Sequence, residues 1–208
     1  MAPSADRRVF FVGDSYVVGI GDPERRGWVG RIAERSDRDG LPVTVYNLGV
    51  RRDTSDDIAR RCAAEVGARR VAGSEDRMVV AFGVNDTAGA CGRPRVPADR
   101  SVANLRAILV EAATARLPVL VVGPPPVADR AQNRRIAALD RQLDTAAEGL
   151  TVPYVSVYAA LAADPRWTDE VERGDGSHPA AQGYALLADL VEPAWRRWIR
   201  DGYRRFGA

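Results

Sequence analysis

Five short apolar runs recur along the chain, separated by longer mixed stretches. Each run is only four to six residues long, rich in Val, Phe or Leu, and four of the five are followed directly by glycine. Runs of this length and composition suit buried strands better than helices. We therefore expect strands over residues 9–12, 43–48, 78–82, 119–122 and 152–157.

Between these runs, apolar residues recur at the three- to four-residue spacing of one helix face. Ser55 or Asp53 is expected to cap the second helix, and Gly149 is placed to end the fourth. The Gly/Pro-rich stretch 89–97 and the segment that carries Trp167 and Asp175 are expected to be loops. The helices are expected over residues 27–39, 54–71, 98–116, 131–148 and 180–198.

This alternation of strands and helices is typical of an α/β protein. Short strands with a helix after each predict a doubly wound parallel sheet with right-handed crossovers. The chain has 208 residues, of which 46% are hydrophobic, enough to bury one complete core. We expect a single domain over residues 1–208, without internal repeats.

Charge and cysteine content exclude several classes of protein. The 30 basic residues, all arginine, and the 28 acidic residues are spread along the chain, so no arm for nucleic acid or a membrane is expected. No apolar run approaches the ~20 residues that span a bilayer, and no secretory leader precedes the first strand, which favours a cytoplasmic protein. Cys62 and Cys91 are too few for a metal site and are expected to be free thiols in or near the core.

Polar residues follow several of the predicted strands. Ser15 comes just after the first strand, Gly49 after the second, and Asn85 after the third. The pair Asp175 and His178 lies between the fifth strand and the last helix. Ligands of open parallel sheets bind beyond the carboxyl ends of the strands, so these residues are expected to meet at one rim of the sheet.

The residue types at this rim match the needs of acyl transfer, which are a nucleophile, a base, a group that orients the base, and donors for an oxyanion. Ser15 is the candidate nucleophile. His178, the only histidine in the chain, is the natural base near neutral pH. Asp175 lies three residues before it and can orient its ring. The backbone N–H groups of Ser15 and Gly49, with the side-chain amide of Asn85, are candidate oxyanion donors.

Four short blocks carry a family resemblance: Gly13-Asp14-Ser15, Gly49, Gly83-Val84-Asn85-Asp86 and Asp175-Gly176-Ser177-His178. In order and spacing they resemble the signature blocks of the SGNH hydrolases, also called GDSL-type esterases and lipases. The resemblance implies a three-layer α/β/α, flavodoxin-like fold and a serine hydrolase of carboxylic esters that needs no metal or organic cofactor.

The same resemblance implies a role for each site residue. Ser15 becomes the nucleophile and first oxyanion donor, Gly49 and Asn85 the other donors, His178 the base and Asp175 its orienting acid. Tyr16 stands where the older motif name has leucine, and its ring is expected to line the pocket.

Structural alternatives remain for each of these residues. Ser15 is also a suitable helix N-cap, and His178 could cap the last helix. Asp164 and Asp169 precede Asp175 in the same segment and are alternative carboxylates. Asp14 and Asp86 are expected to brace their loops as hydrogen-bond acceptors.

The expected partner is a small-molecule ester, whose identity the sequence leaves open. Arg51 and Arg52 follow Gly49 directly, and we hypothesise that one of them contacts an anionic group of the substrate. Trp167 lies in the segment that carries the base and is a further candidate contact. Thioesters, lysophospholipids and acetylated sugars suit the same machinery, and a non-catalytic binding module is the alternative of another class. A flavodoxin-like nucleotide binder is disfavoured because no Gly-rich phosphate loop follows the first strand.

Overall fold

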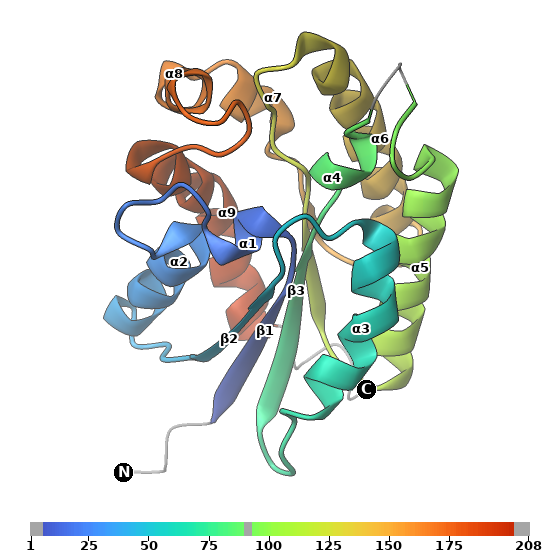
Figure 1. The fold of residues 1–208 in the computed structure, drawn as a ribbon. Coiled ribbons are helices and arrows are strands. Elements are labelled where there is room, and N and C mark those ends of the chain that lie inside the picture. The colour runs from blue at the N-terminus through green and yellow to red at the C-terminus, as the bar shows by residue number, and fades with distance from the viewer. Residues whose placement is uncertain (1–5, 90–92, 202–208) are drawn as a thin grey trace.

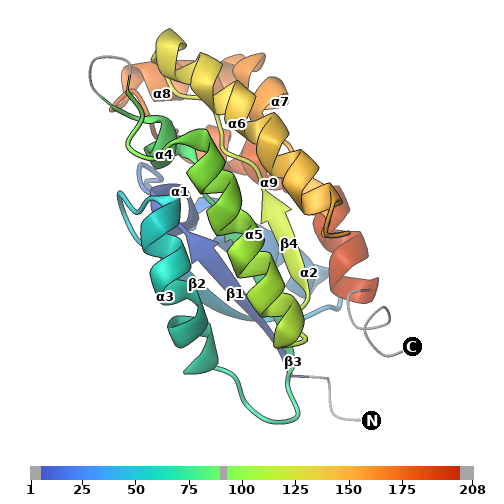
Figure 2. The same cartoon turned by 90° about the vertical axis from the view of Figure 1, so that its right-hand side faces the viewer.

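Five parallel strands form the centre of the computed structural model, which describes residues 6–89 and 93–201. The strand order in the sheet is β2-β1-β3-β4-β5, and every neighbouring pair is parallel. Helices cover both faces of the sheet, as Figures 1 and 2 show. The predicted α/β fold with a five-stranded parallel sheet is therefore confirmed. The strands are β1 (Arg7–Gly13), β2 (Thr44–Gly49), β3 (Glu75–Ala81), β4 (Val119–Val122) and β5 (Tyr154–Val155).

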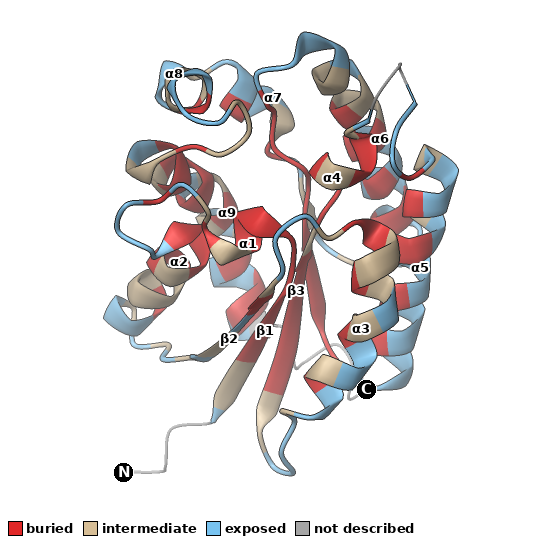
Figure 3. Cartoon of the chain, in the orientation of Figure 1, coloured by how far each residue is buried: buried red, intermediate tan, exposed pale blue. Residues whose placement is uncertain are grey.

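The alternation of side chains along β1 explains why the core has two halves. Val9 and Phe11 point to one face of the sheet and belong to one apolar cluster. Phe10 and Val12 point to the other face and belong to a second cluster. Because a central parallel strand is covered on both faces, an uninterrupted apolar run is what such a strand requires. Figure 3 shows the buried strands between helices whose outer sides are exposed.

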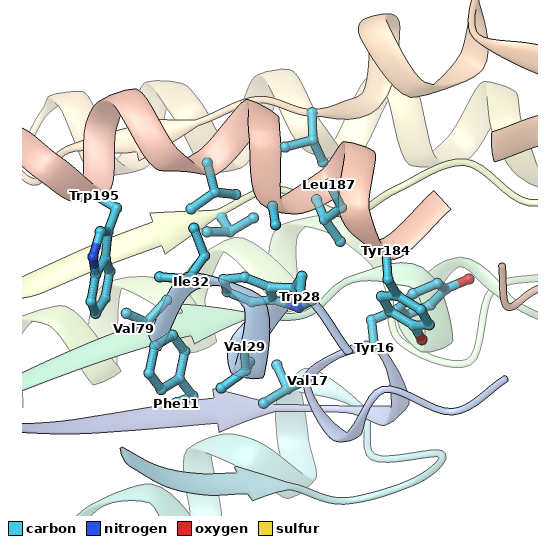
Figure 4. Packing of buried hydrophobic residues seen from close by; sticks show 14 of the residues in the cluster. Phe11, Tyr16, Val17, Trp28, Val29, Ile32, Val79, Tyr184, Leu187 and Trp195 are labelled. Carbon is cyan, nitrogen blue, oxygen red and sulfur yellow. The ribbon is translucent and has the colours of Figure 1, made fainter. Parts of the chain in front are cut away.

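The two halves of the core differ in composition. The half under α2 (Gly27–Arg38) and α9 (Ala181–Asp201) is rich in aromatic rings, and Figure 4 shows part of it. Phe11 packs edge-on against Trp28, with ring centroids 5.6 Å apart, and stacks on Trp195 at the same distance. The other half lies under α3 (Ser55–Gly67), α5 (Ala98–Thr114) and α6 (Arg130–Glu148), and is mainly aliphatic.

Helix α3 differs from the sequence prediction at both ends. Its N-cap is Thr54, not Ser55 or Asp53, because Thr54 and Asp57 form a reciprocal capping box. The helix ends at Gly67 rather than near Val71. Capping pairs residues three apart, so a choice among adjacent Asp, Thr and Ser depends on which one has a partner at the third position.

The segment between β5 and the last helix is the largest departure from the prediction. It was expected to be a loop, but it forms α7 (Tyr158–Ala162) and α8 (Pro165–Arg173). Asp164 caps α8 by accepting from the N–H of Arg166, and Pro165 occupies the first turn, where its missing N–H costs nothing. β5 is also shorter than predicted, because it holds only two residues at the edge of the sheet.

Two short helices, α1 (Ser15–Val18) and α4 (Val84–Thr87), follow β1 and β3 and were not predicted with these bounds. Cys62 is buried as a free thiol, and burial raises the pKa of this thiol to about 12. Cys91 lies outside the described residues. Within the described ranges, no helix has both the length and the apolar character to cross a bilayer.

Candidate active site

Ser15 is the first residue of α1, immediately beyond the carboxyl end of β1. The N-cap of this helix is Asp14, whose carboxylate accepts from the N–H of Tyr16 at 3.0 Å. The capping role considered for Ser15 therefore belongs to Asp14, and the Ser15 hydroxyl is available for another contact. Its Oγ lies 2.8 Å from Nε2 of His178.

The segment that carries His178 is organised around Asp175. One carboxylate oxygen, Oδ1, accepts from the backbone N–H groups of Ser177 and His178, at 3.0 and 2.8 Å. The other, Oδ2, lies 2.7 Å from Nδ1 of the His178 ring. Gly176 has φ +79°, a left-handed value that glycine accepts without a steric penalty. A turn of four residues thus fixes both the backbone and the ring of His178.

These contacts also set the charge of Asp175. Partial burial acts to raise its pKa, but the hydrogen bonds from the backbone and ring of His178 and from the N–H of Ser177 outweigh burial and lower the pKa to about 2. Asp175 therefore stays a carboxylate at any pH of practical interest. The alternative carboxylates are engaged elsewhere, since Asp164 caps α8 and Asp169 pairs with Arg173.

Glu170 holds the other side of the His178 segment, and it was missed in the sequence. Its Oε2 accepts from the backbone N–H groups of Ala180 and Gly183, at 2.9 and 2.7 Å, and its Oε1 from that of Gln182 at 3.2 Å. A side chain of α8 thus satisfies the free donors at the beginning of α9. His178 does not cap this helix. Only the fold could reveal this contact, because Glu170 is ten residues from the nearest N–H that it accepts.

Tyr16 connects the two sides of the site. Its hydroxyl donates to the carbonyl of Ser177 at 2.6 Å, and its ring centroid lies 5.0 Å from that of the His178 ring. Trp167 stacks against the same tyrosine at 6.3 Å, but it is buried, and its Nε1 donates to the carbonyl of Pro126. The structure therefore places Trp167 in the core behind Tyr16 and not on the wall of the cavity, which corrects the expectation that it contacts substrate.

Gly49 is placed differently from the prediction. It ends β2, an edge strand, and its N–H donates to Oδ1 of Asn47 at 3.1 Å. The alternation of a parallel ladder explains this orientation, because the next N–H, that of Val50, is the one that bonds inward to Gly13. A Cβ at Gly49 would meet the N of Val18 at 2.6 Å and the carbonyl of Asp14 at 2.8 Å. Glycine is required here so that α1 can approach β2, and the predicted oxyanion donation by Gly49 conflicts with this geometry.

The turn after β2 reaches the cavity instead. Asp53 N–H donates to the carbonyl of Val50, which closes a turn whose two central residues are Arg51 and Arg52. Arg52 has φ +73°, a conformation that type II turns require at this position and that usually selects glycine. The carbonyl of Arg52 accepts from the Arg95 side chain at 3.1 Å. Among the described residues, the N–H groups of Arg51 and Arg52 have no acceptor.

Asn85 lies on α4, beside the end of this turn. Its Nδ2 donates to Oδ2 of Asp14 at 3.2 Å and to the carbonyl of Asp53 at 3.0 Å. Its amide therefore joins three segments that lie far apart in the sequence. Asp86, the next residue, accepts from the N–H of Ser55 and the hydroxyl of Ser101. Asp14 and Asp86 thus both brace their loops as hydrogen-bond acceptors.

These groups surround a small, open cavity of about 220 Å³. Its lining contains Ser15, His178 and Asp175, together with Asn85 and the turn arginines. Gln132 on α6 was not foreseen as a wall residue, and its amide donates to the carbonyl of Val84 at 2.9 Å. The residues that line the cavity are Ser15, Tyr16, Arg51, Arg52, Val84, Asn85, Ala88, Gln132, Asp175, Ser177 and His178.

A family model covers most of this arrangement. The GDSL-like Lipase/Acylhydrolase family matches residues 11–186, which include the ends of β1 and β3 and the His178 segment. The chain belongs to this family, and by class it is a carboxylic ester hydrolase. A stretch of 52 residues is also 42% identical to the protein YpmR of Bacillus subtilis, a match that covers 24% of this chain and 20% of that protein.

Solved structures with the same fold include several esterases. A lipase/acylhydrolase from Enterococcus faecalis is 24% identical, with a TM-score of 0.71, over 93% of this chain and 96% of that one. The acetylxylan esterase Axe2 from Geobacillus stearothermophilus is 19% identical, with a TM-score of 0.72, over 96% of both chains. The psychrotrophic esterase EstA from Pseudoalteromonas is 17% identical, with a TM-score of 0.73, over 94% of this chain and 100% of that one. At these identities, the likeness is one of fold.

Proposed function

We propose that this protein hydrolyses carboxylic esters through an acyl-enzyme on Ser15, with His178 as base and Asp175 as its orienting acid. The observation that carries the proposal is the continuous chain of contacts from Asp175 Oδ2 to His178 Nδ1 (2.7 Å) and from His178 Nε2 to Ser15 Oγ (2.8 Å). Each bond lies within the reach expected between nucleophile, base and orienting group.

The tautomer of the histidine follows from these partners. Because Asp175 is a carboxylate, it accepts from Nδ1–H, which leaves the lone pair of Nε2 facing the Ser15 hydroxyl. His178 takes the hydroxyl proton while Oγ attacks the acyl carbon, and it then donates that proton to the leaving alcohol. Water, activated by the same nitrogen, attacks the acyl-enzyme and releases the acid. Asp175 stabilises the imidazolium that forms in each half of the reaction.

Three donors are placed to receive the oxyanion in this proposal. The N–H of Ser15 is in the first turn of α1, where backbone donors lack partners within the helix. The N–H of Arg52 replaces that of Gly49, because the turn 50–53 lines the cavity whereas the Gly49 N–H is bonded at the sheet edge. Asn85 supplies the third donor from its Nδ2.

The size of the cavity favours a small acyl group. A volume of about 220 Å³ lies below the ~300 Å³ at which pockets for drug-sized ligands begin. Much of the wall is polar, since Ser15, Asn85, Gln132 and both turn arginines contribute to it. We therefore propose short-chain esters of polar alcohols as the substrate class, and acetylxylan, the substrate in the name of Axe2, is one example of that class.

The test of the reaction is covalent labelling combined with turnover. A fluorophosphonate probe should add one label to the wild-type protein, at Ser15, and none to Ser15→Ala. The wild type should hydrolyse 4-nitrophenyl acetate faster than 4-nitrophenyl octanoate. A folded wild-type protein that neither labels nor turns over acetate would refute the catalytic assignment and favour the binding module.

We further propose that the turn arginines favour esters whose alcohol carries an anionic group. Both Arg51 and Arg52 line the cavity, and within the described part of the chain neither forms an ion pair. Many other arginines, such as Arg31 and Arg61, are paired with carboxylates. A guanidinium without a counter-ion at the mouth of a cavity is suited to bind a carboxylate or phosphate.

A matched pair of substrates tests this preference. 4-Acetoxybenzoate and 4-acetoxybenzamide share the acetyl group and differ in charge. In Arg51→Gln/Arg52→Gln, we expect the ratio of kcat/KM for the anionic over the neutral ester to fall about tenfold, which corresponds to ~1.4 kcal/mol. The control is Arg106→Gln/Arg141→Gln, which removes the same charge from the groove between α5 and α6. An unchanged ratio in the site variant, or an equal fall in the control, would rule out direct contact.

A further inference from the structure

Asp14 is buried between the nucleophile and the oxyanion side of the cavity. Its side chain joins both, since Oδ1 accepts from the N–H of Tyr16 at 3.0 Å and Oδ2 from Nδ2 of Asn85 at 3.2 Å. A cap of a four-residue helix requires only the first of these bonds. The second bond reaches a residue 71 positions away, on a different strand end.

The amide of Asn85 has two ends of nearly equal shape and opposite hydrogen-bonding character. Only Nδ2 can donate to an oxyanion, so the orientation of the amide decides whether Asn85 stabilises or repels the developing charge. An ionised carboxylate accepts hydrogen bonds and donates none, and therefore selects the nitrogen end. The carbonyl of Asp53 on the other side, 3.0 Å from Nδ2, makes the same selection.

We propose that Asp14 is a positioning residue, whose carboxylate holds the Asn85 amide with its N–H end at the oxyanion site. This inference rests on the proposed function, because it assigns Asn85 to the oxyanion. Nδ2 shares its two hydrogens between Asp14 and Asp53, so the oxyanion recruits one of them by competition. The contact with Asp14 is the longer of the two.

The surroundings of Asp14 make its charge dependent on pH. Burial raises its pKa to about 7 against the lowering effect of the Tyr16 N–H, with Asp86 and Asp53 raising it further and the Asn85 amide lowering it. The other groups that face it are the hydroxyls of Tyr16 and Tyr184, on α1 and α9. The nearby guanidinium of Arg61 pairs with Asp53 at 2.7 Å and not with Asp14.

Protonated Asp14 has an O–H to donate, and the amide oxygen of Asn85 is then an acceptable partner. Only the Asp53 carbonyl then still selects the nitrogen end, so the orientation preference weakens and turnover falls with it. The acid limb of kcat/KM for the wild type should therefore include an additional proton, which binds to Asp14. In Asp14→Asn, which keeps the shape and the capping ability of the side chain, that additional proton should be absent.

A double-mutant cycle separates positioning from a general structural role. Asp14→Asn should lower kcat by about tenfold or more, towards the ~10²-fold loss typical of a missing oxyanion donor, with little change in KM. In an Asn85→Ala background, Asp14→Asn should cost less than about twofold, because its target is gone.

Asp86→Asn serves as the matched control, since Asp86 is equally buried but bonds to Ser55 and Ser101 instead of Asn85. Any decrease in kcat caused by Asp86→Asn should be the same in the Asn85→Ala background. Additive losses from Asp14→Asn and Asn85→Ala, or an unchanged acid limb in a folded Asp14→Asn protein, would overturn the inference. Fluorophosphonate labelling of Ser15 in the wild type distinguishes that outcome from failure of the proposed function.

Discussion

The two sides of the cavity are built in different ways. On the base side, Asp175, Gly176, Ser177 and His178 form a turn in which the Asp175 carboxylate accepts all three of its hydrogen bonds from residues at most three positions away. On the oxyanion side, the amide of Asn85 depends on Asp14 and Asp53, which lie 71 and 32 positions away. The first side is a local motif, and the second exists only after the sheet has formed.

The two carboxylates of the site show the same contrast. Asp175 is half exposed and accepts three hydrogen bonds from its own turn, and these lower its pKa to about 2 against partial burial. Asp14 is fully buried without an ion pair in the described chain, and its pKa is raised to about 7. The local turn stabilises the negative charge of Asp175, whereas burial in the tertiary structure disfavours a negative charge on Asp14.

The largest expected effect comes from the base side. Ser15→Ala or His178→Ala should reduce kcat by about 10⁶-fold, and Asp175→Asn by about 10⁴-fold, since Asn favours the wrong tautomer of the ring. Single-turnover and steady-state rates on 4-nitrophenyl acetate measure these losses. Combining His178→Ala with Ser15→Ala should add almost nothing. A multiplicative loss would show that the two residues do not act as a unit.

A smaller loss is expected on the oxyanion side. Asn85→Ala should lower kcat by about 10²-fold with KM nearly unchanged, because the donor acts on charge that appears only in the transition state. The comparison with Asn47→Ala, whose amide serves Val17 and Gly49 at the sheet edge, provides a control. Equal losses in the two variants would mean that Asn85 is no more than a structural residue.

The pH dependence of stability should separate the two carboxylates. The folded-state pKa of Asp14 lies above its value of 3.8 in the unfolded chain, so folded protein binds the extra proton between about pH 4 and 7. The free energy of unfolding should thus fall as the pH rises, by about 2–3 kcal/mol between pH 5 and 8 relative to Asp14→Asn.

For Asp175 the sign is opposite. Its folded-state pKa lies below the unfolded value, and its contribution, reduced by exposure to solvent, is lost only as the pH falls from about 4 towards 2. Urea melts of the wild type and Asp14→Asn at pH 5 and 8 test the first sign, and melts of the wild type and Asp175→Asn between about pH 2 and 5 test the second. If the difference in free energy of unfolding between the wild type and Asp14→Asn were the same at both pH values, the raised pKa of Asp14 would be contradicted.

The smallest expected effect concerns the turn after β2. Arg52→Gly should raise the free energy of unfolding by about 1 kcal/mol relative to Arg52→Ala, since φ +73° is strained for any residue with a Cβ. Chemical denaturation of both variants measures the difference. Gly40→Ala, also at positive φ but with open space around a Cβ, should lose a similar amount from strain alone. If Arg52→Gly were the less stable variant, a different turn conformation would be indicated.

Several parts of the fold follow from the sequence alone. The run 119–122 coincides with β4, and the bounds of α6 differ from the prediction by a single residue. These elements carry strong local signals: an isolated apolar run between Pro118 and Gly123, and a helix with an Asp129 cap that accepts from two N–H groups. The order of Ser15, Asn85, Asp175 and His178 after the strand ends was equally visible.

Other features were decided by the tertiary structure. The N–H of Gly49 bonds to Asn47 at the outer edge of β2, whereas Arg51 and Arg52 lie in the turn beyond that strand and line the cavity. The strand order that puts β2 at the edge is not encoded in one run of residues. Trp167 was placed by the helix α8, which buries it behind Tyr16. The raised pKa of Asp14 requires packing from α1, α4 and the turn 50–53 together.

The sequence by itself determined the parallel α/β architecture, the position of Ser15 at the end of the first strand and the Asp175–His178 turn, because strands, helices and tight turns are set by contacts among residues close along the chain. Only the tertiary structure decided the hydrogen-bond partners of the Asn85 amide, the size of the cavity and the raised pKa of Asp14. These depend on burial and on distances between segments up to 163 positions apart, as between Ser15 and His178, and such distances are set when the layers pack.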